Sequence, residues 1–153
     1  ALNIAMSSFG VPVPGGHLYL NDAVICTAAI LLDPLGAFFV GGVGAFLGDF
    51  FFYPAPMFVS LVTHGLQAVV VSLCAHKLTK EHRGCGALVG VTLGIIINVA
   101  GYSVGRALVY ATPEAAMLKF PFQVFQAAFG AAVSMLLCFK AGLLTFWDKF
   151  SQR

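Results

Sequence analysis

Residues 57–75 read MFVSLVTHGLQAVVVSLCA and contain no Asp, Glu, Lys or Arg. An α-helix rises about 1.5 Å per residue and the hydrocarbon core of a bilayer is about 30 Å thick, so about 20 such residues cross it once. The whole chain has the same character: 59% of its 153 residues are hydrophobic and 9% are charged, against about 25% charged in a soluble domain. We therefore expect one integral membrane domain over 1–153, which argues against a soluble enzyme and a disordered chain. The net charge of +2 gives no support to a nucleic-acid partner.

Other apolar runs flank this span on both sides. The fold predicted from them is all-α, a six-helix transmembrane bundle whose first helix is truncated, because the run at 1–9 is too short to cross a bilayer and is expected to be the end of a helix whose beginning is missing. The two runs that follow it are also short and are interpreted either as two tilted spans or as a re-entrant hairpin. The expected segments are 1–9, 22–32, 37–53, 57–75, 84–105 with a possible extension to 110, and 120–147.

The connecting segments contain turn residues and most of the charges. Residues 10–21 include two prolines and three glycines and are predicted to be a loop, with Asp22 as the N-cap of the next helix. Residues 111–119 are predicted to be a polar loop. Positive charge collects on one side of the predicted topology, which places that side and both termini in the cytoplasm. The residues on that side are Lys77, Lys80, Arg83, Lys140, Lys149 and Arg153, with His82 in the same charged loop, against Arg106 and Lys119 on the outer side.

Small residues recur at four-residue spacing, which lets helix backbones approach closely in lipid. We expect these faces to pack helices against one another within the bundle. They comprise Gly44 with Gly48, Gly86 with Gly90 and Gly94, and Gly101 with Gly105; Ala1 and Ala5 form a face of the same kind on the first helix.

Uncharged polar residues gather in the outer halves of the later helices. Polar groups within a span cost free energy and usually mark a site, although bonds between helices are the alternative explanation for each of them. Four helices carrying such groups at one depth predict an outward-facing pocket for a small, neutral, hydrogen-bonding ligand, with ring stacking on Phe58, Tyr102, Phe122 or Phe125. The candidate binding residues are Asp49, His64, Gln67, Asn98, Tyr102, Gln123 and Gln126, together with His17 and Asn21 from the loop that can cover them.

Three segments resemble the substrate-binding S components of energy-coupling factor (ECF) transporters, and within them the riboflavin-type group that includes the hydroxymethylpyrimidine and pyridoxine S components. The resemblance lies in GGHLYLNDA at 15–23, LLDPLG at 31–36 and GGVGAFLGD at 41–49, supported by Gln126 followed by Ala-Ala-Phe-Gly130. It implies a multi-pass protein of the bacterial cell membrane that captures a vitamin or vitamin precursor, with hydroxymethylpyrimidine or pyridoxine as the expected ligand. It also implies docking to a transmembrane coupling subunit and two cytoplasmic ATPases, with Ala1 and Ala5 at the coupling interface.

Two other functions remain open on the residues alone. A self-sufficient secondary transporter or channel is the main alternative, and a small intramembrane enzyme using His64 and Asp49 is the weakest. The sequence has no HExxH, GxSxG or Walker motif and no His/Cys set at metal spacing. We therefore expect no catalytic residues, no metal site and no cofactor.

Overall fold

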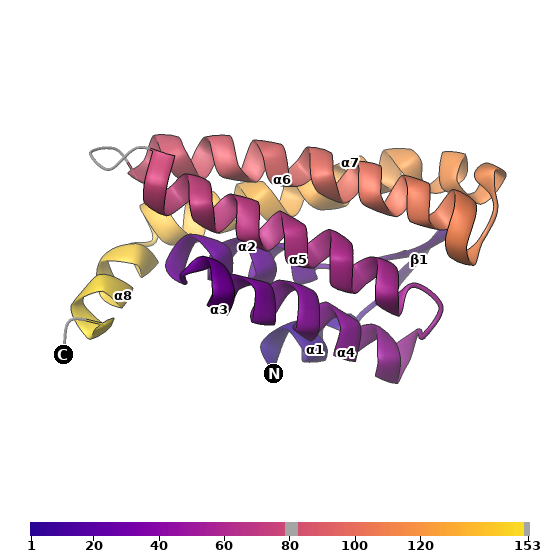
Figure 1. Cartoon of the computed structure of the whole chain (residues 1–153), viewed down its shortest axis with the longest axis horizontal. Coiled ribbons are helices and arrows are strands. Elements are labelled where there is room, and N and C mark those ends of the chain that lie inside the picture. The colour runs from indigo at the N-terminus through magenta and orange to yellow at the C-terminus, as the bar shows by residue number, and fades with distance from the viewer. Residues whose placement is uncertain (79–82, 152–153) are drawn as a thin grey trace.

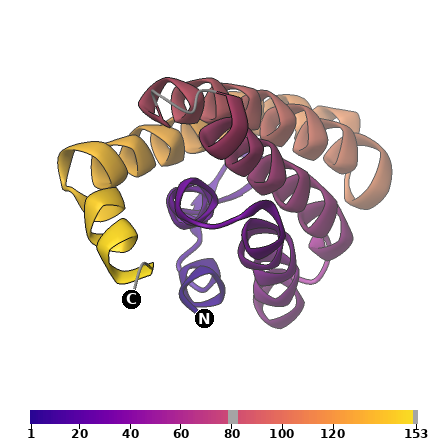
Figure 2. The same ribbon diagram turned by 60° about the vertical axis from the view of Figure 1, so that its left-hand side comes forward.

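The computed structural model describes residues 1–78 and 83–151, and it confirms the all-α class. Lys80, His82 and Arg153, which entered the charge argument, lie outside the described residues. Three short helices accompany the long ones: α1 (Leu2–Ser7), α2 (Asn21–Leu31) and α8 (Leu143–Ser151). The N-terminal helices pack beneath an arch formed by the later long helices, and α8 turns away at one end (Figures 1 and 2).

Four helical segments are long and apolar enough to cross a membrane. Each is an α-helix that contains or ends in a π-helical turn. The first combines α3 (Pro34–Phe38), the π-turn Phe39–Val43 and α4 (Gly44–Phe52). The others are α5 (Met57–Leu73) continued to Leu78, α6 (Arg83–Gly105) continued to Tyr110, and α7 (Pro113–Met135) continued to Lys140. The predicted extension of the 84–105 span to Tyr110 is therefore confirmed.

The segment before the first long span does not cross the bundle. With 11 residues, α2 is about 16 Å long, roughly half the thickness of a hydrocarbon core. The remaining depth is filled by an antiparallel hairpin of β1 (Val11–Val13) and β2 (Gly16–Leu18), so the predicted loop at 10–21 contains two strands. Gly15 closes the hairpin with φ of +80°, and a Cβ atom there would lie 2.8 Å from the Ala115 carbonyl oxygen. The hairpin thus packs directly against α7.

Both boundaries predicted for the last span are wrong. The helix begins at Pro113, because the Thr112 hydroxyl accepts a hydrogen bond from the Ala115 amide and proline suits the first turn of a helix. Only residues 111–112 remain of the polar loop expected at 111–119. At the other end the span stops at Lys140 instead of Trp147, since Gly142 takes a φ of +76° and redirects the chain into α8.

The glycine faces pack helices as predicted. A Cβ atom on Gly90 would lie 2.9 Å from the Val71 carbonyl oxygen, and one on Gly101 would lie 2.5 Å from Thr63 Oγ1, so α6 can approach α5 only because these residues are glycine. On the N-terminal side, the missing side chain of Gly44 makes room for Asn3 of α1. Close backbone contact therefore supplies the packing that hydrophobicity cannot supply in lipid.

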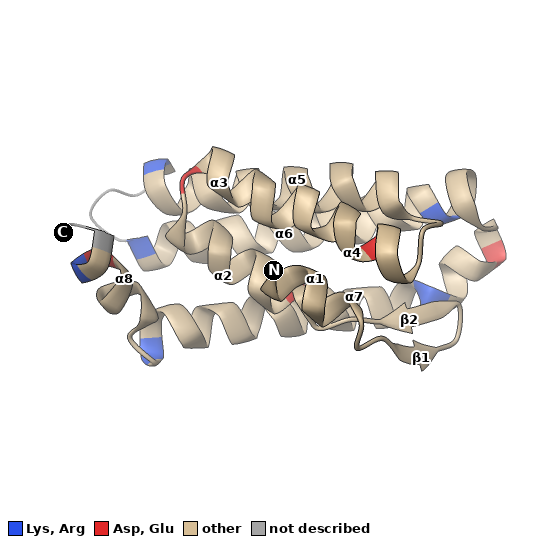
Figure 3. Cartoon of the chain, turned by 90° about the horizontal axis from the view of Figure 1, so that it is seen from below, with Lys and Arg blue, Asp and Glu red and all other residues tan. Residues whose placement is uncertain are grey.

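Helix α8 crosses the end of the bundle instead of continuing α7 (Figure 1), at the end where Lys and Arg gather in Figure 3. Arg83 Nη1 donates to both carboxylate oxygens of Asp148 at 3.0–3.1 Å, which ties α8 to the start of α6. Phe146 and Phe150 remain 66% and 69% exposed. At about 100° per residue, Thr145 and Lys149 fall on the opposite side from Trp147. This clean division between faces is typical of a helix that lies in a membrane interface beside anionic headgroups.

Trp147 is the single tryptophan of the chain, so its fluorescence reports the position of α8 without labelling. In bilayers, we expect lipids brominated near the headgroup end of the acyl chain to quench it more strongly than lipids brominated near the methyl end. Iodide in water should quench it weakly. In the matched control, Thr145→Trp combined with Trp147→Phe, iodide should quench strongly and lipid weakly. Strong iodide quenching of Trp147 itself would show that this face of α8 is turned to water.

Candidate functional site

A buried carboxylate lies at the centre of the bundle. Asp22, in the first turn of α2, is 0% exposed and accepts hydrogen bonds from three side-chain amides. The donors are Gln67 Nε2 of α5 at 3.2 Å, Asn98 Nδ2 of α6 at 2.8 Å and Gln126 Nε2 of α7 at 2.7 Å. Its expected role as an N-cap is wrong, because Leu20 occupies that position. One side chain therefore connects four helices.

The amides extend this network to neighbouring side chains. Gln67 Oε1 accepts from Asn98 Nδ2 at 3.0 Å and lies 2.8 Å from His64 Nδ1. Asn98 Oδ1 accepts from Gln123 Nε2 at 2.6 Å. His64 Nδ1 is also 3.8 Å from Asp22 Oδ1. Buried polar groups in lipid require such partners, since no water is present to supply them.

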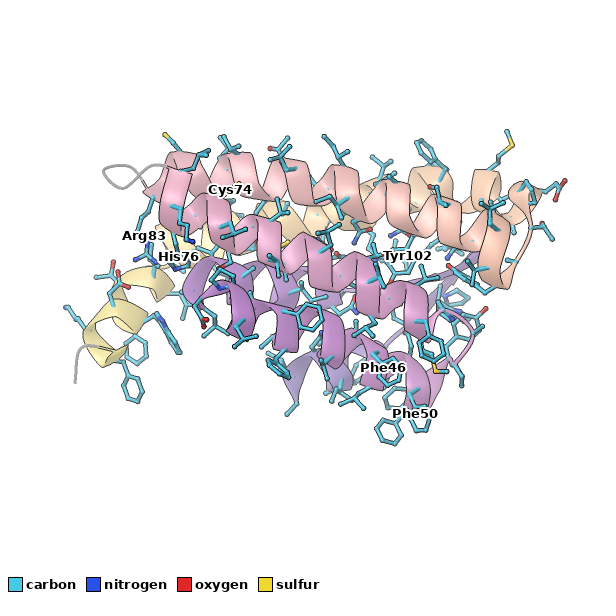
Figure 4. All side chains as sticks on the ribbon, in the orientation of Figure 1. Phe46, Phe50, Cys74, His76, Arg83 and Tyr102 are labelled. Carbon is cyan, nitrogen blue, oxygen red and sulfur yellow. The ribbon has the colours of Figure 1, made fainter. Side chains whose placement is uncertain are left out.

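A second carboxylate heads a separate chain of bonds. Ser60 Oγ donates to Asp49 Oδ2 and lies 2.5 Å from the Tyr102 hydroxyl. The Tyr102 ring meets the His64 ring edge-on, with 5.2 Å between centroids, so the two networks touch. Tyr102 lies well away from Arg83 and His76, which mark the α8 end (Figure 4). The polar groups therefore occupy the half of the bundle opposite α8.

A cavity of about 40 Å³ opens above these networks, between the hairpin, α4, α5, α6 and α7. This volume is close to that of one or two water molecules. The lining residues are Gly15, Gly16, His17, Tyr19, Asn21, Asp49, Tyr53, Pro56, His64, Tyr102, Arg106, Tyr110, Gln123 and Gln126.

The hairpin closes this cavity through bonds to α7. The Tyr19 amide donates to Gln126 Oε1 at 3.0 Å, and Lys119 Nζ donates to the His17 carbonyl oxygen. Burial raises the pKa of the Tyr19 phenol and the nearby Asp49 carboxylate adds to the rise, so the phenol remains a neutral hydroxyl. Lys119, which the sequence places at the outer interface, is in fact buried beneath the hairpin.

Seven of the nine predicted binding residues line the cavity, namely His17, Asn21, Asp49, His64, Tyr102, Gln123 and Gln126. Gln67 and Asn98 lie in the buried network instead, where they hold the lining residues in place. Phe58 and Phe125 do not line the cavity and are 62% and 59% exposed, and Phe122 is likewise absent from the lining, so of the four predicted stacking residues only Tyr102 is at the site.

Several lining or supporting residues are not predictable from the sequence. Asp22 has the sequence position of a local cap because it begins an apolar run, and its distant partners leave no trace in local sequence. Tyr53 and Tyr110 end their helices and carried no recognisable signal, whereas Arg106 was assigned to the outer interface although it is 9% exposed. The four-residue spacing of Asn98, Tyr102 and Arg106 does place all three on one face of α6.

The model of one protein family, described as "ECF-type riboflavin transporter, S component", matches residues 1–142. The chain belongs to this family. Its members are transporter subunits embedded in the membrane and are not enzymes. The hypothesis of an intramembrane enzyme is therefore wrong. The chain is also similar to UPF0397 proteins of Streptococcus agalactiae serotypes Ia, V and III, at 28% identity over 96 residues. That match covers 61% of this chain and 53% of each relative, so the chain spans about half the length of these curated relatives.

Replacing Asp22 with Asn tests whether the central carboxylate organises the S component fold. The substitution keeps the shape but sets an NH₂ group against amide donors, so we expect the free energy of unfolding to fall by about 2–4 kcal/mol. Asp33→Asn is the matched control, because Asp33 is exposed, caps α3 through the Gly36 amide, and Asn caps equally well. Unfolding by SDS in mild detergent micelles measures both. Equal stability of the two variants would contradict the central role of Asp22.

Proposed function

We propose that the chain is the high-affinity substrate-binding subunit of an ECF-type importer for a vitamin or vitamin precursor. The observation that carries this proposal is the cavity itself: amides, phenols and an imidazole converge on it, with Asp49 and Arg106 beside them, at one end of the bundle beneath a hairpin. Such a closed polar site within an apolar protein suits a small hydrogen-bonding molecule. The half of the bundle toward α8 contains an apolar core around Ala75, Ala87 and Cys138 and thus forms a floor beneath the site.

A monocyclic pyrimidine or pyridine alcohol, such as hydroxymethylpyrimidine or pyridoxine, is the ligand that we favour. The name of the matched family refers to riboflavin, whose three fused rings need far more room. The cavity of about 40 Å³ has to widen for either ligand, and a single ring needs the smaller widening. The tyrosines that line the cavity, Tyr19, Tyr53, Tyr102 and Tyr110, supply faces and edges for one aromatic ring.

The proposed partners are a transmembrane coupling subunit and two ATPases, which supply the energy for uptake. Helix α1 supports the proposed coupling interface, because its two faces differ. Asn3 and Ser7 are buried, with Asn3 Nδ2 donating to the Val40 carbonyl oxygen at 2.7 Å, whereas Ala1 and Ala5 are exposed. A small-residue face is thus left free in the described part of the molecule for another membrane helix.

Ligand binding by the isolated chain tests the proposed function. We expect pyridoxine or hydroxymethylpyrimidine to raise the thermal unfolding midpoint of the purified protein, and riboflavin to raise it less. A ligand at 100 times its Kd stabilises the folded state by about 2.7 kcal/mol. Asp49→Asn, which changes the cavity lining, should weaken binding at least about tenfold, whereas the matched variant Asp33→Asn should bind normally.

Two results would count against this function. No stabilisation by any of the three compounds, with the protein folded, would argue against a vitamin receptor. Ligand uptake by proteoliposomes that contain this chain alone would favour a self-sufficient secondary transporter or channel.

Substitution of the exposed alanine face separates binding from coupling. Ala5→Leu should leave ligand binding within about twofold of the wild type, because Ala5 lies on the exposed face of α1, outside the cavity lining. ATP-driven uptake by the assembled complex should fall at least about tenfold, since a bulky side chain prevents close helix approach. Ala100→Leu, at an exposed position of α6, is the control and should change neither quantity. Normal uptake by Ala5→Leu would remove α1 from the proposed interface.

A further inference from the structure

Two carboxylates fix the direction of the hydrogen bonds around the cavity. We propose that, as a result, the base of the cavity presents acceptors, so that its ligand is a neutral ring compound that binds through at least two N–H or O–H donors. This inference rests on the proposed function. It narrows the ligand from any polar molecule to one whose N–H or O–H groups point toward the base of the cavity. Two chains of hydrogen bonds run outward from these carboxylates, one from Asp22 and one from Asp49.

The first chain starts at Asp22. An ionised carboxylate only accepts, so Gln67 must turn Nε2 toward it at 3.2 Å, which leaves Gln67 Oε1 facing His64. His64 Nδ1, 2.8 Å from this oxygen, must then carry the proton and donate. This bond fixes the orientation of the His64 ring, which lines the cavity.

The amide of Gln123 is oriented by the same logic. Asn98 Nδ2 donates to Asp22 at 2.8 Å, so Asn98 Oδ1 is turned the other way and accepts from Gln123 Nε2 at 2.6 Å. Gln123 therefore directs Oε1 away from Asn98, and within the described residues no hydrogen bond reaches that oxygen. Since Gln123 also lines the cavity, it presents an acceptor there.

The second chain starts at Asp49. Ser60 has one hydroxyl proton and donates it to Asp49 Oδ2, so the Tyr102 hydroxyl, 2.5 Å away, must donate to Ser60 Oγ. The Tyr102 proton is thereby engaged, and its oxygen offers lone pairs to the cavity. The other carboxylate oxygen of Asp49 is likewise a hydrogen-bond acceptor.

Asn21 supplies an independent indication. Its side chain is 6% exposed, lines the cavity, and its Oδ1 atom has no hydrogen-bond partner among the residues that the structure describes. A buried acceptor without a partner costs about 1–3 kcal/mol, so its presence at a binding cavity indicates a donor supplied by the ligand.

The outer side of the cavity presents hydrogen-bond donors instead of acceptors. Arg106, with its guanidinium 5.6 Å from the centre of the Tyr110 ring, provides only donors, and it lines the cavity close to Gly16 of the hairpin. The ligand is therefore oriented: its donors face Asn21, Gln123 and Tyr102, and a ring nitrogen or other acceptor faces Arg106.

Paired analogues test the polarity of the site. The probes are hydroxymethylpyrimidine and its analogue with methyl in place of the amino group, and pyridoxine and its analogue with methyl in place of the 3-hydroxyl group, each pair compared by isothermal titration calorimetry. Loss of the donor, with the cavity acceptors left unpaired, should weaken the binding of whichever parent binds by about 10- to 100-fold. If a parent compound and its donor-free analogue bind with equal affinity, the cavity acceptors do not recognise that donor and the inference is wrong. The proposed receptor function would remain intact. If neither parent compound binds, the proposed monocyclic ligand is wrong and this inference fails with it, whereas binding of riboflavin would still support a vitamin receptor.

The variant Asn21→Leu adds two measurements, one on the ligand-free protein and one on ligand binding. Removing an unpaired buried acceptor should leave the thermal midpoint of the ligand-free protein unchanged or higher, yet weaken parent binding and reduce the preference for the parent over its donor-free analogue. A lower midpoint would show that Asn21 Oδ1 has a structural partner and would overturn its assignment to the ligand.

Discussion

A carboxylate buried in an apolar bundle must be surrounded by donors, and most of this structure follows from meeting that requirement for Asp22. Three amides from α5, α6 and α7 point at it, at 2.7–3.2 Å. Each of these amides is itself costly in lipid, and each is stabilised by the others. The N-terminus of α2 is thereby held at mid-depth. Gly130 permits this, because a Cβ atom there would lie 2.5 Å from Asp22 Cβ.

The short length of α2 connects the network to function. Because α2 begins inside the bundle, the preceding hairpin has to occupy the outer half, where it covers the cavity and is tied to α7 by Tyr19 and Lys119. The same network that fixes the helices also orients Gln123 and His64 at the base of the cavity. Stability and recognition therefore depend on the same side chains, which explains why the polar residues of an otherwise apolar chain are concentrated in one half.

Sequence reasoning predicted what depends on hydropathy and depth. The spans over 57–75 and 84–110 and the gathering of polar residues around His64, Tyr102 and Gln126 could be predicted, because burial in lipid selects these patterns directly. The role of Asp22 could not, since its partners lie 45 to 104 residues away. The start of α7 is not predictable from Lys119, which the sequence places at the outer interface, because the hairpin carbonyl of His17 accepts its hydrogen bond within the protein. Hairpin depth and the turn into α8 depend on tertiary packing and on Gly142.

A crystal structure of the protein with its tightest-binding ligand would show directly whether the cavity beneath the hairpin is the binding site. We expect the ligand ring to lie between the hairpin and α7, in contact with Gln123 and Tyr102, while Asp22 keeps its bonds to Gln67, Asn98 and Gln126. A ligand bound elsewhere, such as the apolar groove between α6 and α7 lined by Val99 and Phe120, would contradict this expectation. So would a ligand that takes the place of the amides around Asp22.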